Sequence, residues 1–111
     1  MTIIHVFLLM LGGHALADYP LQGDFLAKAK NHLAPLPGVP WYHALAAHSI
    51  IHGLFVGLIT GSALLAVAEA LSHASIDYMK SDGTVSFNVD QALHLGCKAI
   101  WCGLFFAIPG I

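Results

Sequence analysis

Apolar residues fill four long stretches of this chain, and a pair of polar side chains at helical spacing interrupts each stretch. The four pairs are His14/Asp18, His48/His52, His73/Asp77 and Asp90/His94. The members of a pair are four positions apart, so on an α-helix they share one face and lie about 5–6 Å apart. The pattern therefore predicts four helices that each present two metal-competent groups to a neighbouring helix.

Helix-breaking residues limit the first helix and separate it from a short second segment. The first helix is expected over about residues 2–19, because Pro20 cannot continue the hydrogen-bond ladder. A short amphipathic segment follows, with Asp24 as its N-cap and with Lys28 and Lys30 away from its apolar face. We expect this segment to lie along a membrane interface with its lysines among the lipid headgroups.

The remaining apolar sequence divides into three helices. A single helix over residues 42–79 would be about twice as long as the ~30 Å hydrocarbon core of a bilayer. We therefore place a break at Thr60-Gly61-Ser62, which gives helices over about 42–59 and 62–80. The last helix is expected to begin after Asn88, with Gln91 completing a capping box, and to end near Pro109.

Composition indicates a membrane protein. The 111 residues predict one domain spanning 1–111, with 58% hydrophobic and only 9% charged residues against about 25% charged in a typical soluble domain. In an up-down-up-down arrangement the four polar pairs meet at similar depths, within about two helical turns of one another. The expected fold is therefore all-α, a four-helix antiparallel transmembrane bundle with a short interfacial helix between the first and second helices.

Charge and cysteine content exclude other classes. The four basic residues are all lysines, so the chain lacks the basic patch of a nucleic-acid-binding protein. Membrane lipids are the expected partners instead, and the short chain leaves a homo-oligomer open. Cys97 and Cys102 are five residues apart in one helix, too far for an unstrained disulfide, so we expect buried thiols.

Two features bear on membrane insertion. The apolar run from Ile3 to Gly13, followed by Ala15-Leu16-Ala17, has the form of a signal peptide, but it lacks a basic n-region and cleavage would remove His14. We therefore favour a retained first helix. Lys28, Lys30 and Lys80 lie at the end of the bundle that holds the site, which predicts a bacterial inner-membrane protein with its site facing the cytoplasm.

The acidic residues are the strongest argument for bound metal. Asp18, Glu69, Asp77 and Asp90 fall within or beside apolar helices, and each ionised group at a bilayer centre costs about 2.5–3.5 kcal/mol. Lys98 is the one cation within the helices, so it cannot balance them all. Divalent cations could. The expected ligands are His14, Asp18, His48, His52, His73, Asp77, Asp90 and His94.

Histidine and aspartate ligands without thiolate suit zinc, with manganese or iron as alternatives. Eight candidate ligands are enough for two ions, and helical bundles are a known architecture for dinuclear sites. Glu69, one turn before His73, is a candidate general base or outer-shell group, or else a carboxylate paired with a neighbouring helix. Gln22 and Lys98 are further candidates for the outer shell. His5, His32 and His43 have no partner at helical spacing and are expected at the surface.

Several motifs carry a family resemblance. The run from Gly13 to Gln22, then Lys30, the His48/His52 helix and the segment Asp90-Gln91-Ala92-Leu93-His94 resemble the domain-of-unknown-function 3307 family of small bacterial and phage membrane proteins. The resemblance implies a membrane location and the importance of these polar positions, and it brings no assigned activity with it. The His-x-x-x-Asp pattern on apolar helices is also distantly similar to membrane-bound metal-dependent hydrolases.

Three functions remain open from the sequence. The first is a metal-dependent hydrolase, in which a metal-activated water attacks a phosphoester or a lipid-like substrate. The second is a carrier or channel for metal ions or protons that uses the same residues. The third is a bis-histidine haem protein, with His48 or His52 and His94 as axial ligands. Structural hydrogen bonding between helices is the alternative to all three.

Overall fold

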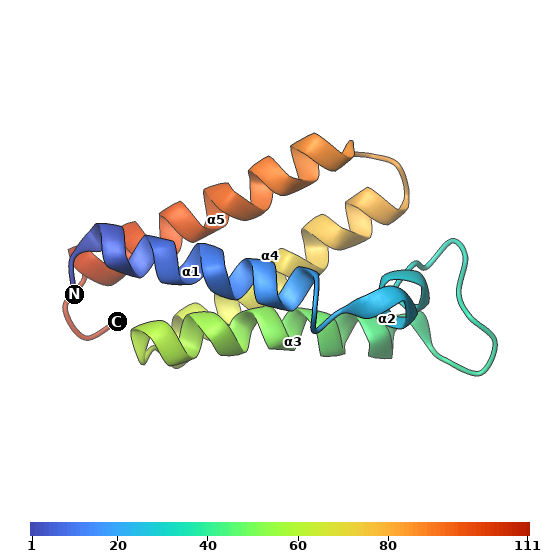
Figure 1. Cartoon of the computed structure of the whole chain (residues 1–111), viewed down its shortest axis with the longest axis horizontal. Helices are drawn as coiled ribbons and strands as arrows, with labels where there is room; N and C mark the ends of the chain where they lie inside the picture. Colours follow the sequence, from blue (N-terminus) through green and yellow to red (C-terminus); the bar gives the residue numbers. More distant parts are fainter.

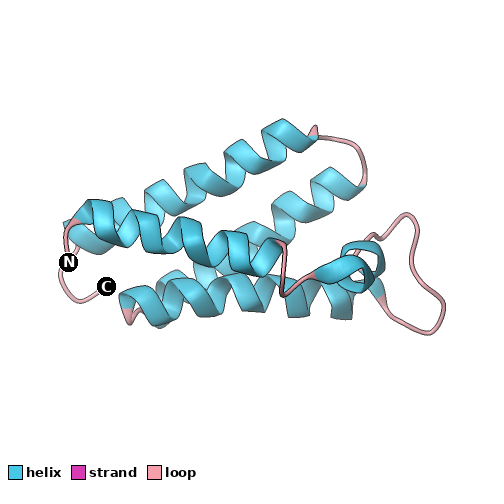
Figure 2. Ribbon diagram, viewed as in Figure 1, coloured by secondary structure: helices cyan, strands magenta, loops and turns pink.

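The computed structural model describes residues 1–111 as five helices without strands. Figures 1 and 2 show how loops connect these helices. Their bounds are α1 Ile3–Asp18, α2 Gly23–Ala29, α3 Trp41–Thr60, α4 Ala63–Ser81 and α5 Phe87–Ala107. Helix α2 is short and the other four are long. The predicted all-α arrangement, with a short helix between the first two long ones, is confirmed.

The four long helices run up, down, up and down around a common interior (Figure 1). In this ring α1 packs against α3 and α5, and α4 packs against the same two helices. Both chain termini and the turn between α3 and α4 lie at one end of the bundle (Figure 1). We call the opposite end, which contains the C-terminal ends of α1 and α4, the α2 end, because α2 lies beside it.

Local chemistry explains where most helices stop and start. Helix α1 ends at Asp18, two residues before Pro20, and the Gln22 side-chain amide donates to the Asp18 carbonyl at 3.0 Å. The predicted break after α3 is also present. Gly61 adopts a left-handed conformation with φ of 71°, and the Ser62 hydroxyl accepts a hydrogen bond from the Leu65 N–H.

Two predicted N-caps are wrong. Helix α5 begins at Phe87, two residues earlier than predicted, because Ser86 rather than Asn88 is its N-cap and accepts a hydrogen bond from the Val89 N–H. Helix α2 begins at Gly23, so Asp24 lies inside the first turn, and no side chain caps that end. In both cases the residue predicted as the cap, Asn88 or Asp24, is of a type that often caps helices but is the second residue of the helix itself.

Small residues allow α3 and α4 to pack closely. A Cβ atom added at Gly53 would lie 2.5 Å from the Ala66 carbonyl oxygen, and one at Gly57 would lie 3.0 Å from Ala66 Cβ. The recurrence of glycine every four residues on α3 thus marks a helix contact, as the spacing indicates.

The bundle is polar inside and apolar outside. Eleven of its 23 buried residues are polar or charged. A small apolar core occupies the end near the termini and consists of Val6, Met10, Val56, Leu65 and Cys102. Large apolar side chains are exposed on all four long helices, among them Leu8, Leu54, Leu71 and Ile100. This distribution is the reverse of the one expected for a helical bundle in water.

Only α3 is both long enough and apolar enough by itself to qualify as a candidate membrane span. Helices α1 and α2 qualify only as a pair, and that pair is bent by 84°. The helical bundle is therefore established, whereas the crossing of a membrane by all four long helices is not confirmed. Helix α1 has only 16 residues, and α4 and α5 each carry buried charged side chains, Glu69 and Asp77 on α4 and Asp90 and Lys98 on α5.

Candidate metal centre

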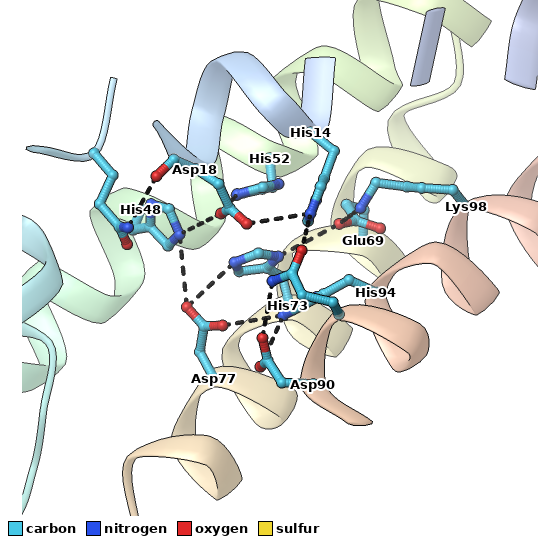
Figure 3. A network of polar contacts seen from close by, with 12 residues as sticks. His14, Asp18, His48, His52, Glu69, His73, Asp77, Asp90, His94 and Lys98 are labelled. Carbon is cyan, nitrogen blue, oxygen red and sulfur yellow. Dashed lines mark hydrogen bonds and ion pairs between the residues drawn. The ribbon is translucent and has the colours of Figure 1, made fainter. Parts of the chain in front are cut away.

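The four polar pairs meet in the interior of the bundle, towards the α2 end. Figure 3 shows side chains from α1, α3, α4 and α5 pointing towards one another. Five of these side chains are imidazoles and three are carboxylates. We call this set the His/Asp cluster, and its members are His14, Asp18, His48, His52, His73, Asp77, Asp90 and His94. The convergence expected from helical spacing is present.

Asp18 is the centre of one half of the cluster. Its Oδ1 lies 2.8 Å from His52 Nε2 and 3.3 Å from His48 Nε2. Its Oδ2 lies 3.1 Å from His14 Nε2. The Asp18 carboxylate thus contacts His14 on its own helix and both histidines of α3, and these four side chains form one group of possible metal ligands.

Asp77 is the centre of the other half. Its Oδ1 lies 3.1 Å from His94 Nε2, and its Oδ2 lies 3.3 Å from His73 Nε2. Asp90 Oδ1 is 3.2 Å from the same His94 nitrogen. His48 links the two halves, since its Nε2 also lies 3.6 Å from Asp77 Oδ2.

The imidazole rings pack directly on one another. The ring centroids of His52 and His73 are 3.6 Å apart and stacked, and those of His73 and His94 are 4.2 Å apart. All five histidines of the cluster are buried. Close packing of this kind leaves the Nε2 atoms facing the two central carboxylates rather than lipid or solvent.

The donor spacing fits metal ions. Asp18, His48, His52 and His73 can each offer one atom within 4.8 Å of the others, and so can His73, Asp77 and His94. Ligands held tetrahedrally at the 2.0–2.1 Å typical of zinc are separated by about 3.3 Å. The contacts around Asp18 and Asp77 span 2.8–3.3 Å, apart from the longer link through His48. These groups could therefore hold a metal ion, although oxygen–nitrogen contacts of this length are also those of hydrogen bonds.

Unpaired buried atoms provide a second test of fit. The Nδ1 atoms of all five cluster histidines are buried without a hydrogen-bond partner of good geometry. The same is true of three atoms within the cluster, His48 Nε2, His73 Nε2 and Asp90 Oδ1. Buried polar atoms are normally satisfied, and those without partners call for an explanation. All three atoms face the interior of the cluster, where a cation would engage their lone pairs.

The position of Lys30 contradicts the prediction that this side chain lies among lipid headgroups. Its ammonium, at the C-terminal end of α2, lies 2.6 Å from Asp77 Oδ2 and also donates to the Gln22 side-chain oxygen. Position 30 directly follows Ala29, the one buried residue of α2, so it lies on the flank of the buried face. Gln22, predicted as an outer-shell residue, thus holds both the end of α1 and Lys30.

A second polar group lies behind the cluster, on the side of the apolar core. Glu69 and Lys98 form a buried ion pair, 0% and 1% exposed, and Trp101 Nε1 donates to the other Glu69 oxygen at 2.6 Å. Glu69 Oε1 also lies 3.7 Å from His73 Nδ1, the ring nitrogen that faces away from Asp77. Trp101 lies in an apolar run, and nothing in the sequence pattern marks it as a hydrogen-bond donor to this pair.

Gln91 was also missed as a member of the site. Its side-chain oxygen lies 3.3 Å from His14 Nε2, and its side-chain nitrogen donates to Asp90 Oδ2 at 3.0 Å. It therefore connects α5 with α1. Its position directly after Asp90 was the available signal.

The histidines outside the four pairs do not join the cluster. His5 is exposed and contacts Thr2, and His43 is exposed beside Tyr42. His32 is half-buried and stacks on Tyr78 at 3.7 Å between ring centroids. Both cysteines are free thiols, and of the two expected to be buried, Cys102 is buried and Cys97 is half-buried.

The family comparison agrees with the motif resemblance. A family model described as a protein of unknown function, DUF3307, matches residues 6–108. The chain belongs to the DUF3307 family. The match includes every member of the His/Asp cluster. No curated protein and no solved structure matches the chain.

Proposed function

We propose that this DUF3307 protein holds two divalent cations in the His/Asp cluster. One ion would take the group around Asp18, formed by His14, Asp18, His48 and His52. The other would take the group around Asp77, formed by His73, Asp77, Asp90 and His94. The observation that carries the proposal is that Asp18, His48, His52 and His73, and likewise His73, Asp77 and His94, bring metal-binding atoms from four helices within 4.8 Å of one another. His14 and Asp90 join these sets through their contacts with Asp18 and His94.

Charge balance supports two cations rather than none. Lys30 pairs with Asp77, and Lys98 pairs with Glu69. Asp18 and Asp90 have no lysine partner, and both contact only imidazoles or amides. Buried carboxylates need an opposite charge or a metal, so two sites with one unpaired aspartate each match this arrangement. Imidazole and carboxylate donors favour zinc, with manganese and iron as alternatives.

Glu69 is better placed to position His73 than to act as a base. Both of its oxygens are engaged, by Lys98 and by Trp101, and it faces the Nδ1 side of the His73 ring. Metal-ligating histidines commonly direct their second nitrogen at a carboxylate, which orients the ring. We therefore assign Glu69 and Lys98 to the outer shell of the site.

We further propose that the bundle is embedded in a membrane. The supporting observation is its apolar exterior around a polar interior, since exposed leucines and isoleucines occur on every long helix. Helix α3, with 20 residues, is about 30 Å long, the thickness of a hydrocarbon core. Lys28 and Lys80 are exposed near the α2 end, which favours placing that end at the cytoplasmic face.

Among the activities considered, the site favours hydrolysis. A cavity of about 100 Å³ reaches the three cluster aspartates from the α2 end. Two cations bound there would activate water and polarise an ester. The protein would contribute the arrangement of the ligands, the support of His73 by Glu69, and a polar cavity that reaches the aspartates.

Transport through the bundle is less well supported. A path from the cluster to the other end would cross the Glu69–Lys98 pair and then the apolar core. Haem ligation is also disfavoured. His52 and His94 are 6.4 Å apart between ring centroids, and the His73 ring stacks on both of them, so a porphyrin would have no space between them.

Hydrolysis can be separated from transport with purified protein. Detergent-solubilised protein, loaded with zinc or manganese, would be assayed against a panel of chromogenic carboxylic and phosphoric esters. The same preparation in liposomes would be assayed for metal and proton uptake. Turnover that a chelator abolishes and added metal restores, without uptake, supports the hydrolase. Metal-dependent uptake without turnover would replace it with a carrier.

A further inference from the structure

The cavity at the α2 end contains more than metal ligands. Its lining consists of Asp18, Tyr19, Gln22, Lys30, Asp77, Lys80, Phe87, Asp90 and Gln91. Its volume of about 100 Å³ is well below the ~300 Å³ at which pockets for drug-sized ligands begin. The cavity therefore has room for one small polar group rather than for a whole nucleotide or lipid.

Two lysines on different elements line this cavity. Lys30 comes from the end of α2 and lies against Asp77, and Lys80 comes from the last turn of α4 and lies with its ammonium 5.2 Å from the centroid of the Phe87 ring. The amide side chains of Gln22 and Gln91 add further polar groups to the wall. None of these four residues belongs to the His/Asp pairs.

The charge of the lining depends on metal. Three carboxylates and two lysines face the cavity, which leaves a net negative charge without cations. With one divalent cation at each aspartate group, the same lining becomes strongly positive. Lys30 would then share the Asp77 carboxylate with a cation and become available to a second anion.

We propose that this cavity binds one phosphoryl group, with Lys30 and Lys80 as its anion-binding residues opposite the His/Asp cluster. The inference rests on the proposed function and assigns its substrate as a phosphate ester. A doubly charged tetrahedral group matches two cations and two ammonium groups more closely than a singly charged carboxylate does. The rest of such a substrate would remain outside the cavity, beside the exposed rings of Tyr19 and Phe87 at its rim.

The test measures anion binding without turnover. Inorganic phosphate, and separately a short-chain phosphatidic acid, would be titrated into zinc-loaded protein in detergent and followed by calorimetry. Lys30→Met and Lys80→Met would be compared with Lys28→Met, which removes the same charge from an exposed position of α2 outside the cavity. Zinc content and circular dichroism would be recorded for each variant, so that a loss of fold or metal is recognised.

We expect saturable binding of phosphate that Lys30→Met and Lys80→Met each weaken by at least about tenfold, the loss expected for one charge-assisted hydrogen bond. Lys28→Met should leave it unchanged. Tighter binding of the phosphatidic acid would identify a lipid headgroup as the source, and binding of inorganic phosphate alone would identify a water-soluble ester. Absence of phosphate binding in zinc-loaded protein, or equal weakening by Lys28→Met, overturns the inference.

Failure of the proposed function would look different. In that case the protein would contain no stoichiometric zinc, whatever its affinity for phosphate. If metal-free protein bound phosphate and that binding depended on Lys30, the proposal of an anion site would stand and that of a metal centre would fail. If the protein bound zinc but not phosphate, the proposal of a metal centre would stand and that of an anion site would fail.

Discussion

Lys30 Nζ lies 2.6 Å from Asp77 Oδ2, although the two residues are 47 positions apart in the chain. The same oxygen lies 3.3 Å from His73 Nε2. The ammonium therefore occupies the outer side of the carboxylate that we place at the centre of the second metal group. A positive charge there competes with a cation for Asp77.

Lys30→Met is expected to tighten divalent-cation binding. Removing the ammonium leaves Asp77 with its full negative charge for the metal, and we expect an affinity about tenfold higher, or about 1.4 kcal/mol. Competition with a fluorescent zinc chelator would measure it, with Lys28→Met as the charge-matched control. Weaker zinc binding by Lys30→Met would show that Lys30 supports the metal group rather than competing with it.

Glu69→Ala should destabilise the bundle strongly. It leaves the Lys98 ammonium, 1% exposed, without its carboxylate, and breaking a buried ion pair from one side costs about 3–5 kcal/mol. The double variant Glu69→Ala, Lys98→Met removes both charges and should recover much of that loss. Thermal unfolding in detergent measures both. Equal stability of the single and double variants would mean that the pair contributes no such coupling.

Gly53→Ala is expected to separate α3 from α4. Its new Cβ would lie 2.5 Å from the Ala66 carbonyl oxygen, which is backbone and cannot move independently, so we expect a cost of about 1–3 kcal/mol. Gly12→Ala is the matched control, because nothing lies within 4 Å of a Cβ at that helical position. It should stabilise the protein by about 0.5–1 kcal/mol. The opposite ranking of the two melting temperatures would contradict the observed helix packing.

Membrane insertion can be tested with single cysteines in a Cys97→Ser, Cys102→Ser background. Leu54→Cys lies on the exposed apolar face of α3, and Asp82→Cys lies in the turn between α4 and α5. In membranes, a charged maleimide should label position 82 but not position 54. Labelling of position 82 in inverted vesicles and not in intact cells would place the α2 end in the cytoplasm. Rapid labelling of position 54 in membranes would show that this face meets water.

Helical spacing was sufficient to predict the eight-residue cluster. A residue and its partner four positions later must share a helix face, and four such faces have only one interior in common. Pro20 and the break at Gly61 positioned α1, α3 and α4 to within a few residues. These features are local, so the sequence carries them directly.

The contacts made across the bundle could not be predicted in the same way. Lys30 reaches Asp77 because the chain bends by 84° between α1 and α2, and no periodicity in the seven residues of α2 specifies that bend. Tryptophan is a residue type often found on lipid-facing surfaces, yet the indole N–H of Trp101 on α5 donates to Glu69 on α4, 32 positions earlier in the chain. Partners of this kind depend on which faces meet, and each face is known only once the others are placed.

The metal content of the purified protein tests the central claim most directly. Elemental analysis would compare the wild-type chain with His48→Ala, His73→Ala, which removes one imidazole from each proposed metal group, and with His5→Ala, His43→Ala, which removes two exposed histidines. Circular dichroism would confirm that each is helical. We predict about two equivalents of a divalent metal in the wild type and in the exposed-histidine control, and a large loss in the cluster variant. Equal metal content in all three proteins, or none in the wild type after metal loading, would contradict the account.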